Sequence, residues 1–219
     1  MAKNGRYEPV HTLAYDFVHK LSRKEEFLLK DGSTAGPMHV FADMLANPQY
    51  WRTQKIIAIK KNSGVQSLIG LDNKEKYASF TDFFGGEFTY KLAKPASDAW
   101  QKDQGKRNLL DKELIKTDER VNLLFMMFGG EMLTIFPAPK ASSSEWIHWT
   151  DSLAKIPLAE NPDETAITYQ AIMWKYITDL VNATQTGNYK DADKMLADIS
   201  AIQRAATKEG VIPSKAMVK

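Results

Sequence analysis

The stretch Lys106–Phe128 has the longest run of helical periodicity in the sequence and predicts a central helix. Its apolar residues recur at steps of three and four, a spacing that places side chains on one face of a helix. The last turn is apolar in the remaining directions as well, so we expect it to be buried on all sides. Gly129 and Gly130 should end the helix, because glycine readily takes the left-handed conformation found at helix C-termini. The apolar positions are Leu110, Leu114, Val121, Leu124, Phe125 and Phe128, with Leu123, Met126 and Met127 completing the last turn.

Asp118 lies at the edge of this apolar stripe, about one turn from Leu114 and Asn122. Its carboxylate is either a structural group, held by a cap or a salt bridge, or a buried functional acid. No second acidic residue shares its face close by, which favours the structural interpretation.

The last third of the chain has the pattern of two antiparallel helices joined by a turn that contains glycine. The first helix is expected from Pro162 to about Thr186, and the second from Tyr189 to about Thr207. The turn resembles the joint of a tetratricopeptide repeat, but no second copy occurs at a 34-residue offset, so a repeat-like binding surface is the minor alternative. The positions expected to be buried are Ile167, Ala171, Trp174, Ile177 and Val181 on the first helix, and Ala192, Met195, Leu196, Ile199 and Ile202 on the second.

Shorter segments predict further helices and two strands. The helices are expected at Thr12–Leu21, Pro37–Leu45 and Tyr90–Lys102, the last of them interrupted at Pro95. The strand candidates are Lys55–Lys60 and Met132–Phe136. An extended segment from Tyr77 should lead into a short helix capped by Ser79. The sequence therefore predicts a mainly α fold, with a long central helix, a C-terminal antiparallel helix hairpin and at most a small β-sheet.

A polar connection, PAPKASSSE, follows the second strand candidate and is the expected internal boundary. We therefore expect an N-terminal helical domain with the central helix at 1–140, and a C-terminal helical hairpin packed on it at 141–219. The alternative is one continuous domain, since 219 residues can bury one or two cores.

The composition is that of a soluble globular protein, with 43% hydrophobic and 26% charged residues. A net charge of +2, with no long basic run and no nucleic-acid-binding motif, argues against nucleic acid as a partner. The chain has no cysteine, which excludes thiolate catalysis, disulfides and cysteine-ligated zinc or iron–sulfur sites. The absence of cysteine suits oxidising and reducing compartments alike.

Neither a signal peptide nor a membrane span is visible in the sequence. Residues 1–20 lack an apolar core followed by a small-residue cleavage site. The most apolar run, Val121–Phe136, is too short for a span, contains Glu131 and is broken by two glycines. Met1 and Ala2 lead directly into a segment expected to be folded, which indicates a soluble piece of a larger protein.

The sequence contains none of the common catalytic or phosphate-binding motifs. The sequence lacks the glycine-rich loops that bind dinucleotides or phosphate, and it lacks the GxSxG and HExxH motifs. Its four histidines, His11, His19, His39 and His148, are not spaced to share a helix face. With no nucleophile–base pair either, we expect no catalytic residue, no metal site and no enzymatic activity of the isolated chain.

The cluster Trp146-Ile147-His148-Trp149 is the most suggestive chemistry in the sequence. An imidazole between two indoles could line a flat aromatic ligand such as haem, with neutral His148 as the axial ligand. The competing interpretation is that Trp146 and Trp149 anchor a loop to the core while His148 points outward, and the alternating spacing in a short loop favours it.

The sequence contains, in this order, GRYEPVHTLAYDFVHKLSRKEEF, NPQYW, KYASFTDFF, YKL, DKELIKTDERVN, TIFPAPK and TGNYKDADKML. In these segments it resembles the extracytoplasmic part of fused cytochrome c biogenesis proteins, the large ResB/CcsA-type haem-handling membrane proteins of the Bacteroidetes kind. The resemblance extends over nearly the whole chain and is most specific in DKELIKTDERVN and ASFTDFF.

The resemblance implies a periplasmic domain of an inner-membrane cytochrome c synthase, a machine that exports haem and attaches it to CxxCH motifs of apocytochromes. The implied partners are the rest of the membrane-embedded synthase and apocytochrome c. The family's tryptophan-rich haem motif and its haem-liganding histidines belong to the membrane-embedded portion, which this chain lacks, and WIHW does not match that motif. No catalytic residue is therefore carried over, and haem is expected to be handled by the parent protein rather than bound tightly by this domain.

Two functional hypotheses follow. The first is a non-catalytic module that docks or positions partner proteins, and the second is a domain that binds haem or another small ligand directly. For docking, the candidate surface is the exposed side of the C-terminal hairpin around Tyr189, Lys190 and Lys194, with the aromatic loop Trp146–Trp149 second. Exposed aromatic residues flanked by lysine suit a modest, salt-sensitive interface.

Overall fold

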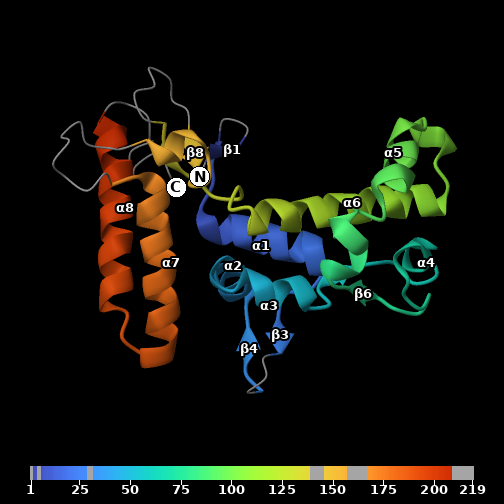
Figure 1. Cartoon of the computed structure of the whole chain (residues 1–219), viewed down its shortest axis with the longest axis horizontal. Helices are drawn as coiled ribbons and strands as arrows, with labels where there is room; N and C mark the ends of the chain where they lie inside the picture. Colours follow the sequence, from blue (N-terminus) through green and yellow to red (C-terminus); the bar gives the residue numbers. More distant parts are fainter. Residues whose placement is uncertain (1, 4–5, 29–31, 139–145, 157–166, 209–219) are drawn as a thin grey trace. The chain divides into compact units, whose positions relative to one another are not determined.

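The computed structural model describes residues 2–3, 6–28, 32–138, 146–156 and 167–208, and in this part of the chain the fold is mainly α-helical (Figure 1). The α-helices are α1 Val10–Ser22, α2 Pro37–Ala46, α3 Pro48–Thr53, α4 Val65–Ile69, α5 Ala93–Gln101, α6 Leu109–Phe128, α7 Tyr169–Thr186 and α8 Lys190–Lys208. The strands are β1 Ala2–Lys3, β2 Arg6–Tyr7, β3 Phe27–Leu28, β4 Thr34–Ala35, β5 Ile57–Ala58, β6 Tyr77–Ala78, β7 Thr134–Pro137 and β8 Trp146–His148. They pair as antiparallel two-stranded sheets, β1 with β2, β3 with β4, β5 with β6 and β7 with β8. The predicted fold class, mainly α with only small sheets, is confirmed.

The chain divides into two compact units. One unit is Val10–Phe128, and the other combines Met1–Pro9 with Gly129–Lys219. The division therefore comes where α6 ends. The sequence-based boundary between residues 140 and 141 lies outside the described residues and stays a prediction.

Helix α6 is the element on which the Val10–Phe128 unit is assembled. Helices α1, α2, α4 and α5 and strand β5 all contact it, and Figure 1 shows α1 running beside it. Leu114, Val121 and Leu124 of the predicted stripe are buried in this contact, each no more than 3% exposed. The central helix, and the part of its buried face that these three residues form, are thus as expected from their spacing.

Helix α6 begins at Leu109, three residues later than predicted, because Asn108 caps it. The Asp111 N–H donates to the Asn108 side chain at 2.9 Å, and the Asn108 N–H donates to Asp111 Oδ2 at 2.9 Å. This reciprocal pair satisfies two of the N–H groups that a helix start leaves without partners. Asp111 also accepts a hydrogen bond from the Lys102 ammonium at 2.6 Å, which together with the Asn108 N–H lowers the pKa of Asp111.

The expectation that the last turn of α6 is buried on all sides is wrong. Met127 is buried, but Phe125 is 60% exposed and Met126 is 39% exposed. An all-apolar turn predicts burial only if neighbouring elements surround it. Here the helices of the unit cover one side of α6.

The expected interruption at Pro95 is also wrong, since α5 runs unbroken from Ala93 to Gln101. Pro95 lies in the first turn of this helix. An N–H in the first turn has no partner within the helix, so proline removes no hydrogen bond there and its fixed φ suits the helix.

The two strand candidates coincide with strands of the structure. Within Lys55–Lys60, β5 pairs with β6, and β7 overlaps Met132–Phe136 and pairs with β8. The N-cap position of the 3₁₀ turn Thr81–Phe83 is Phe80, one residue after the predicted cap Ser79. Ser79 still holds the start of the turn, because its Oγ accepts from the Asp82 N–H at 3.3 Å while the Asp82 carboxylate accepts from the Ser79 N–H at 2.7 Å.

In the other unit, α7 and α8 pack side by side as the predicted helical hairpin (Figure 1). Helix α7 begins at Tyr169 instead of Pro162, because Thr168 is its N-cap and accepts from the Ala171 N–H at 3.0 Å. Residues 162–166 lie outside the described part of the chain. The Gly187 N–H ends α7 by donating to the Ala183 carbonyl at 2.8 Å.

The predicted buried stripe of α7 is rotated from the observed one. Ile177 is buried, but Ile167 and Trp174 are 56% and 55% exposed. The residues of α7 that are buried are Tyr169, Ile172, Met173, Ile177 and Ala183. On α8, Ala192, Met195 and Ile199 are buried as predicted, whereas Leu196 is 47% exposed. Apolar residues occur on more than one face of α7, so periodicity alone did not identify the buried face.

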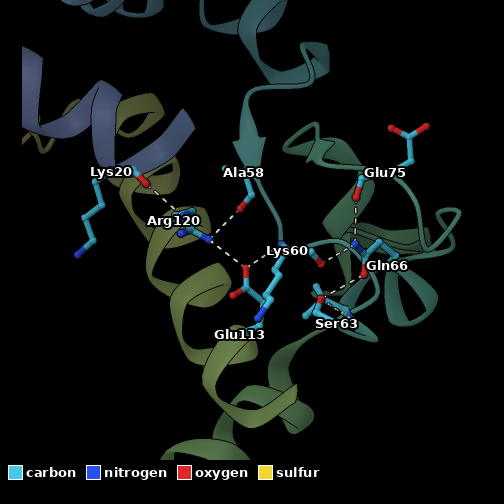
Figure 2. Close-up of polar contacts among 9 residues, drawn as sticks. Lys20, Ala58, Lys60, Ser63, Gln66, Glu75, Glu113 and Arg120 are labelled. Carbon is cyan, nitrogen blue, oxygen red and sulfur yellow. Dashed lines mark hydrogen bonds and ion pairs between the residues drawn. The ribbon is translucent and has the colours of Figure 1, made fainter. Parts of the chain in front are cut away.

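A buried polar network holds the Val10–Phe128 unit together (Figure 2). Arg120 on α6 donates from Nε to the Lys20 carbonyl at 3.1 Å and from Nη1 to the Ala58 carbonyl at 2.8 Å. Glu113, two turns earlier on the same helix, lies 3.5 Å from the same Nη1 and accepts from the Lys60 N–H at 3.0 Å. One ion pair on α6 thus fixes the end of α1 and the strand β5.

The same network extends to the loop after β5 through Gln66 on α4 (Figure 2). The Gln66 amide donates to the carbonyls of Lys60 at 2.8 Å and Glu75 at 3.0 Å, and its oxygen accepts from Ser63 Oγ at 3.2 Å. Gln66 is fully buried. Because each of its polar atoms has a partner, its burial avoids the cost of an unsatisfied amide.

Arg120→Met should destabilise the chain by about 3–5 kcal/mol, because it leaves Glu113 as an unpaired buried charge. The carbonyls of Lys20 and Ala58 also lose their donor. The free energy of unfolding in urea, followed by circular dichroism, measures the change. Lys116→Met is the matched control, since Lys116 is an exposed residue of the same helix and a surface substitution should change stability by less than about 0.5 kcal/mol. Equal stability of the two variants would show that the network does not hold the unit together.

Candidate functional site

The aromatic cluster predicted from the sequence lies on β8 and the turn that follows it. Trp146, Ile147 and His148 form β8, which pairs with β7 so that His148 is opposite Thr134 and Ile147 is opposite Phe136. Ile147 and Trp149 are buried, whereas Trp146 and His148 are partly exposed. The strand therefore alternates sides, with Ile147 on the core side.

Both ring nitrogens of His148 face polar groups of its own turn. Nδ1 lies 2.9 Å from Thr150 Oγ1, and Nε2 lies 3.7 Å from Asp151 Oδ2. An axial ligand to haem iron needs one ring nitrogen free of such a partner. Haem ligation by His148, the less favoured interpretation of the cluster, would use Nε2 while Thr150 holds Nδ1, since 3.7 Å to Asp151 is longer than a hydrogen bond.

Trp149 is an anchor of the fold around the β7–β8 pair. It is 7% exposed and meets Trp174 of α7 edge to face, with ring centroids 5.1 Å apart. It also packs against Gly130, where an added Cβ would come within 2.6 Å of the indole ring. The indole N–H of Trp149 has no hydrogen-bond partner among the described residues. Packing against the hairpin, rather than a polar contact, holds this side chain.

The predicted partner-binding residues lie on the surface at the start of α8. Tyr189, immediately before the helix, is 46% exposed. Lys190 and Lys194 are exposed and lie one turn apart on the helix. Among the described residues neither lysine forms an ion pair. Trp174 and Leu196 add exposed apolar area to the same hairpin. The hairpin therefore combines free positive charge with aromatic and aliphatic surface.

Sequence reasoning missed a pocket of about 520 Å³ in the Val10–Phe128 unit. Its walls come from the end of α1 and the segment after it, from β3, from α2 and α3, from the residues between α3 and β5, and from β6. They include Lys24, Phe27, Asp43, Trp51, Lys55 and Tyr77. No local motif could reveal it, since residues 22–28, Asp43, residues 50–56 and Tyr77 meet there.

Asp118 is a structural carboxylate of α6, as the sequence favoured. It accepts hydrogen bonds from the Tyr90 hydroxyl at 2.9 Å, from Trp100 Nε1 at 3.4 Å and from the Asn122 amide at 3.4 Å. Its partners are thus two aromatic donors and an amide instead of a cation. Burial, with the Asp118 charge second, raises the pKa of Tyr90 well above its usual range. Tyr90 therefore stays a neutral donor.

In the described residues no group of three or more histidine, aspartate or glutamate side chains could hold a metal ion. Among the helices of this same part of the chain, none combines the length and the apolar character that crossing a bilayer requires.

Comparison with known proteins relates the chain to one curated protein. It is 35% identical over 152 residues to the protein NrfI of Wolinella succinogenes, and the match covers 69% of this chain but 16% of NrfI. The chain is homologous to part of NrfI. It thus corresponds to a small fraction of that much longer relative. No protein-family model matches the chain.

Gly130→Ala should destabilise the chain by about 2–3 kcal/mol, because a Cβ there collides with Trp149 and the backbone is left-handed. Gly187→Ala is the matched control. Gly130 has φ +77° and Gly187 has φ +71°, but nothing lies within 4 Å of a Cβ at Gly187. The control should therefore cost only the left-handed strain, about 1 kcal/mol. Urea unfolding and the near-ultraviolet circular dichroism of the tryptophans measure both variants. An equal loss of stability would mean that Trp149 does not pack against Gly130.

Proposed function

We propose that this chain is a non-catalytic module of a cytochrome c maturation protein and acts by docking or positioning partner proteins. The observation that carries the proposal is the 35% identity to part of NrfI, because this homology supports a role in cytochrome c maturation. The resemblance of DKELIKTDERVN and ASFTDFF to the extracytoplasmic part of fused cytochrome c biogenesis proteins supports the same role.

The module works as one segment of a larger protein. The homologous region makes up 16% of NrfI, so most of that relative has no counterpart in this chain. We infer a parent protein of the ResB/CcsA type in the inner membrane, with this module on its periplasmic side. Its partners are then the rest of the membrane-embedded synthase and apocytochrome c.

Docking is favoured over catalysis by the kind of groups that the described residues expose. The ionisable pairs with the deepest burial, Glu113–Arg120 and Asp111–Lys102, are occupied in structural contacts. The hairpin instead presents Tyr189 beside the unpaired cations Lys190 and Lys194. Aromatic area with adjacent charge suits recognition of an acidic or mixed protein surface, where charge governs the rate of encounter.

Direct haem binding through Trp146, His148 and Trp149 is the alternative, and the burial of Trp149 against Trp174 and Gly130 counts against it. Titration of the purified chain with haemin should give the same Soret absorbance for the wild type and for His148→Ala. A Soret shift that the wild type shows and His148→Ala lacks would favour haem ligation by this chain.

Reversal of two charges on the hairpin, Lys190→Glu with Lys194→Glu, should lower holocytochrome c in cells by about two- to fivefold, because it replaces attraction by repulsion at the interface. The changes are made in the full-length protein, and haem-stained cytochrome c is quantified. Lys112→Glu with Lys116→Glu is the matched control, because these lysines are also exposed, also one turn apart, and lie on α6. Both double variants change the charge equally and should fold normally.

Deletion of the whole module decides the broader proposal. Unchanged holocytochrome levels after deletion would rule out a role in maturation. A loss after deletion, with equal and normal levels in the two double variants, would show that the docking surface lies elsewhere on the module.

A further inference from the structure

The pocket in the Val10–Phe128 unit has features of a ligand site that the proposed function does not use. Its walls combine aromatic rings from different elements with a small number of charged groups. At about 520 Å³ it lies in the size range of small-molecule sites. Because it is built within one compact unit, the packing of that unit fixes its geometry.

Lys24 supplies the positive charge of this pocket. Its ammonium lies 4.5 Å from the centre of the Tyr77 ring and 5.9 Å from that of Phe27. Such cation–π contacts hold an ammonium in place on one side, and its other N–H groups stay accessible to a ligand. Among the described residues no carboxylate pairs with Lys24. Its backbone is also fixed, because the Lys24 N–H donates to the buried Ser22 hydroxyl at 3.1 Å and the preceding Arg23 has φ 57°.

The other charged groups of the pocket already have partners. Asp43 accepts from Trp51 Nε1 at 2.8 Å and from the Asn47 amide, and Lys55 pairs with Glu75 at 3.4 Å. Asp43 keeps its negative charge, because both of these partners are neutral donors. Among the described residues that line the pocket, Lys24 is the cation that no carboxylate pairs with. A negatively charged group is the complement that this ammonium lacks.

The aromatic walls determine the rest of the ligand. Trp51 is 7% exposed and is held both by Asp43 and by an edge-to-face contact with Tyr50 at 5.5 Å. Tyr77 and Phe27 are partly exposed and turn ring faces toward the Lys24 ammonium. Rigid aromatic side chains favour a flat, apolar ring system, which can stack on them.

We propose that this pocket binds a flat organic anion, with its carboxylate or sulfonate at Lys24 and its conjugated ring system against the aromatic walls. The site is independent of the hairpin and of the docking role, so either proposal can fail without the other.

Two dyes with the same ring system test this proposal. One is the anion 8-anilinonaphthalene-1-sulfonate, and the other is uncharged N-phenyl-1-naphthylamine, and fluorescence titration gives the affinity of each. Lys24→Gln should weaken binding of the anionic dye about three- to tenfold, the effect of losing one charge-assisted contact. The same substitution should change the affinity for the uncharged dye by less than about twofold. Tyr77→Leu should weaken the binding of both dyes, since it removes one of the aromatic rings that line the pocket.

Lys112→Gln is the matched control, because it removes an exposed lysine of α6 that does not line the pocket, and it should change neither affinity. Urea midpoints equal to that of the wild type show that each variant is folded. The proposal is overturned if the anionic dye does not saturate a single site, if Lys24→Gln leaves its affinity unchanged, or if Lys24→Gln weakens both dyes equally.

Discussion

The fold of the Val10–Phe128 unit depends on a guanidinium that is almost completely removed from water. Burial lowers the pKa of Arg120, and the nearby Glu113 charge opposes that effect. Desolvating an arginine is costly unless its donors are paired. Here they are paired with a carboxylate on the same helix and with carbonyls of α1 and β5. The position of α1 and β5 is therefore dictated by where α6 carries this one side chain.

This constraint explains how a unit with such small sheets keeps its loops in place. A two-stranded sheet such as β5–β6 is marginal alone. Glu113 binds the Lys60 N–H just after β5, and Gln66 binds the carbonyls of Lys60 and Glu75, which continue the two strands at the same end of the sheet. Hydrogen bonds from buried side chains thus replace the ladder that a longer sheet would supply. The pocket lies beside this sheet, because Tyr77 of β6 lines it together with Lys55 and Ile56, which come just before β5.

Sequence periodicity identified the helices because their buried faces repeat at helical spacing, as Leu114, Val121 and Leu124 do. Periodicity did not identify the buried face where a helix carries apolar residues on more than one face. Phe125 and Trp174 were therefore expected to be buried, but both are exposed. The Glu113–Arg120 pair was not predicted, because charged residues are normally expected to be solvated. Both residues nevertheless lie next to positions of the apolar stripe, one residue before Leu114 and Val121. The pocket could not be predicted, because its walls meet only in the folded chain.

The residues that carry the resemblance to cytochrome c biogenesis proteins have structural roles in this molecule. In DKELIKTDERVN, Asp111 caps α6 and Glu113 and Arg120 form the buried pair, while in ASFTDFF the Ser79 and Asp82 side chains cap a turn. Similarity carried by such residues transfers a fold, and chemistry has to be argued from a site. The deeply buried charges of this chain, Asp111, Glu113 and Arg120, have partners within the fold. The surfaces on which docking and ligand binding can be tested are the lysines and aromatic residues of the hairpin and the pocket that Lys24 lines.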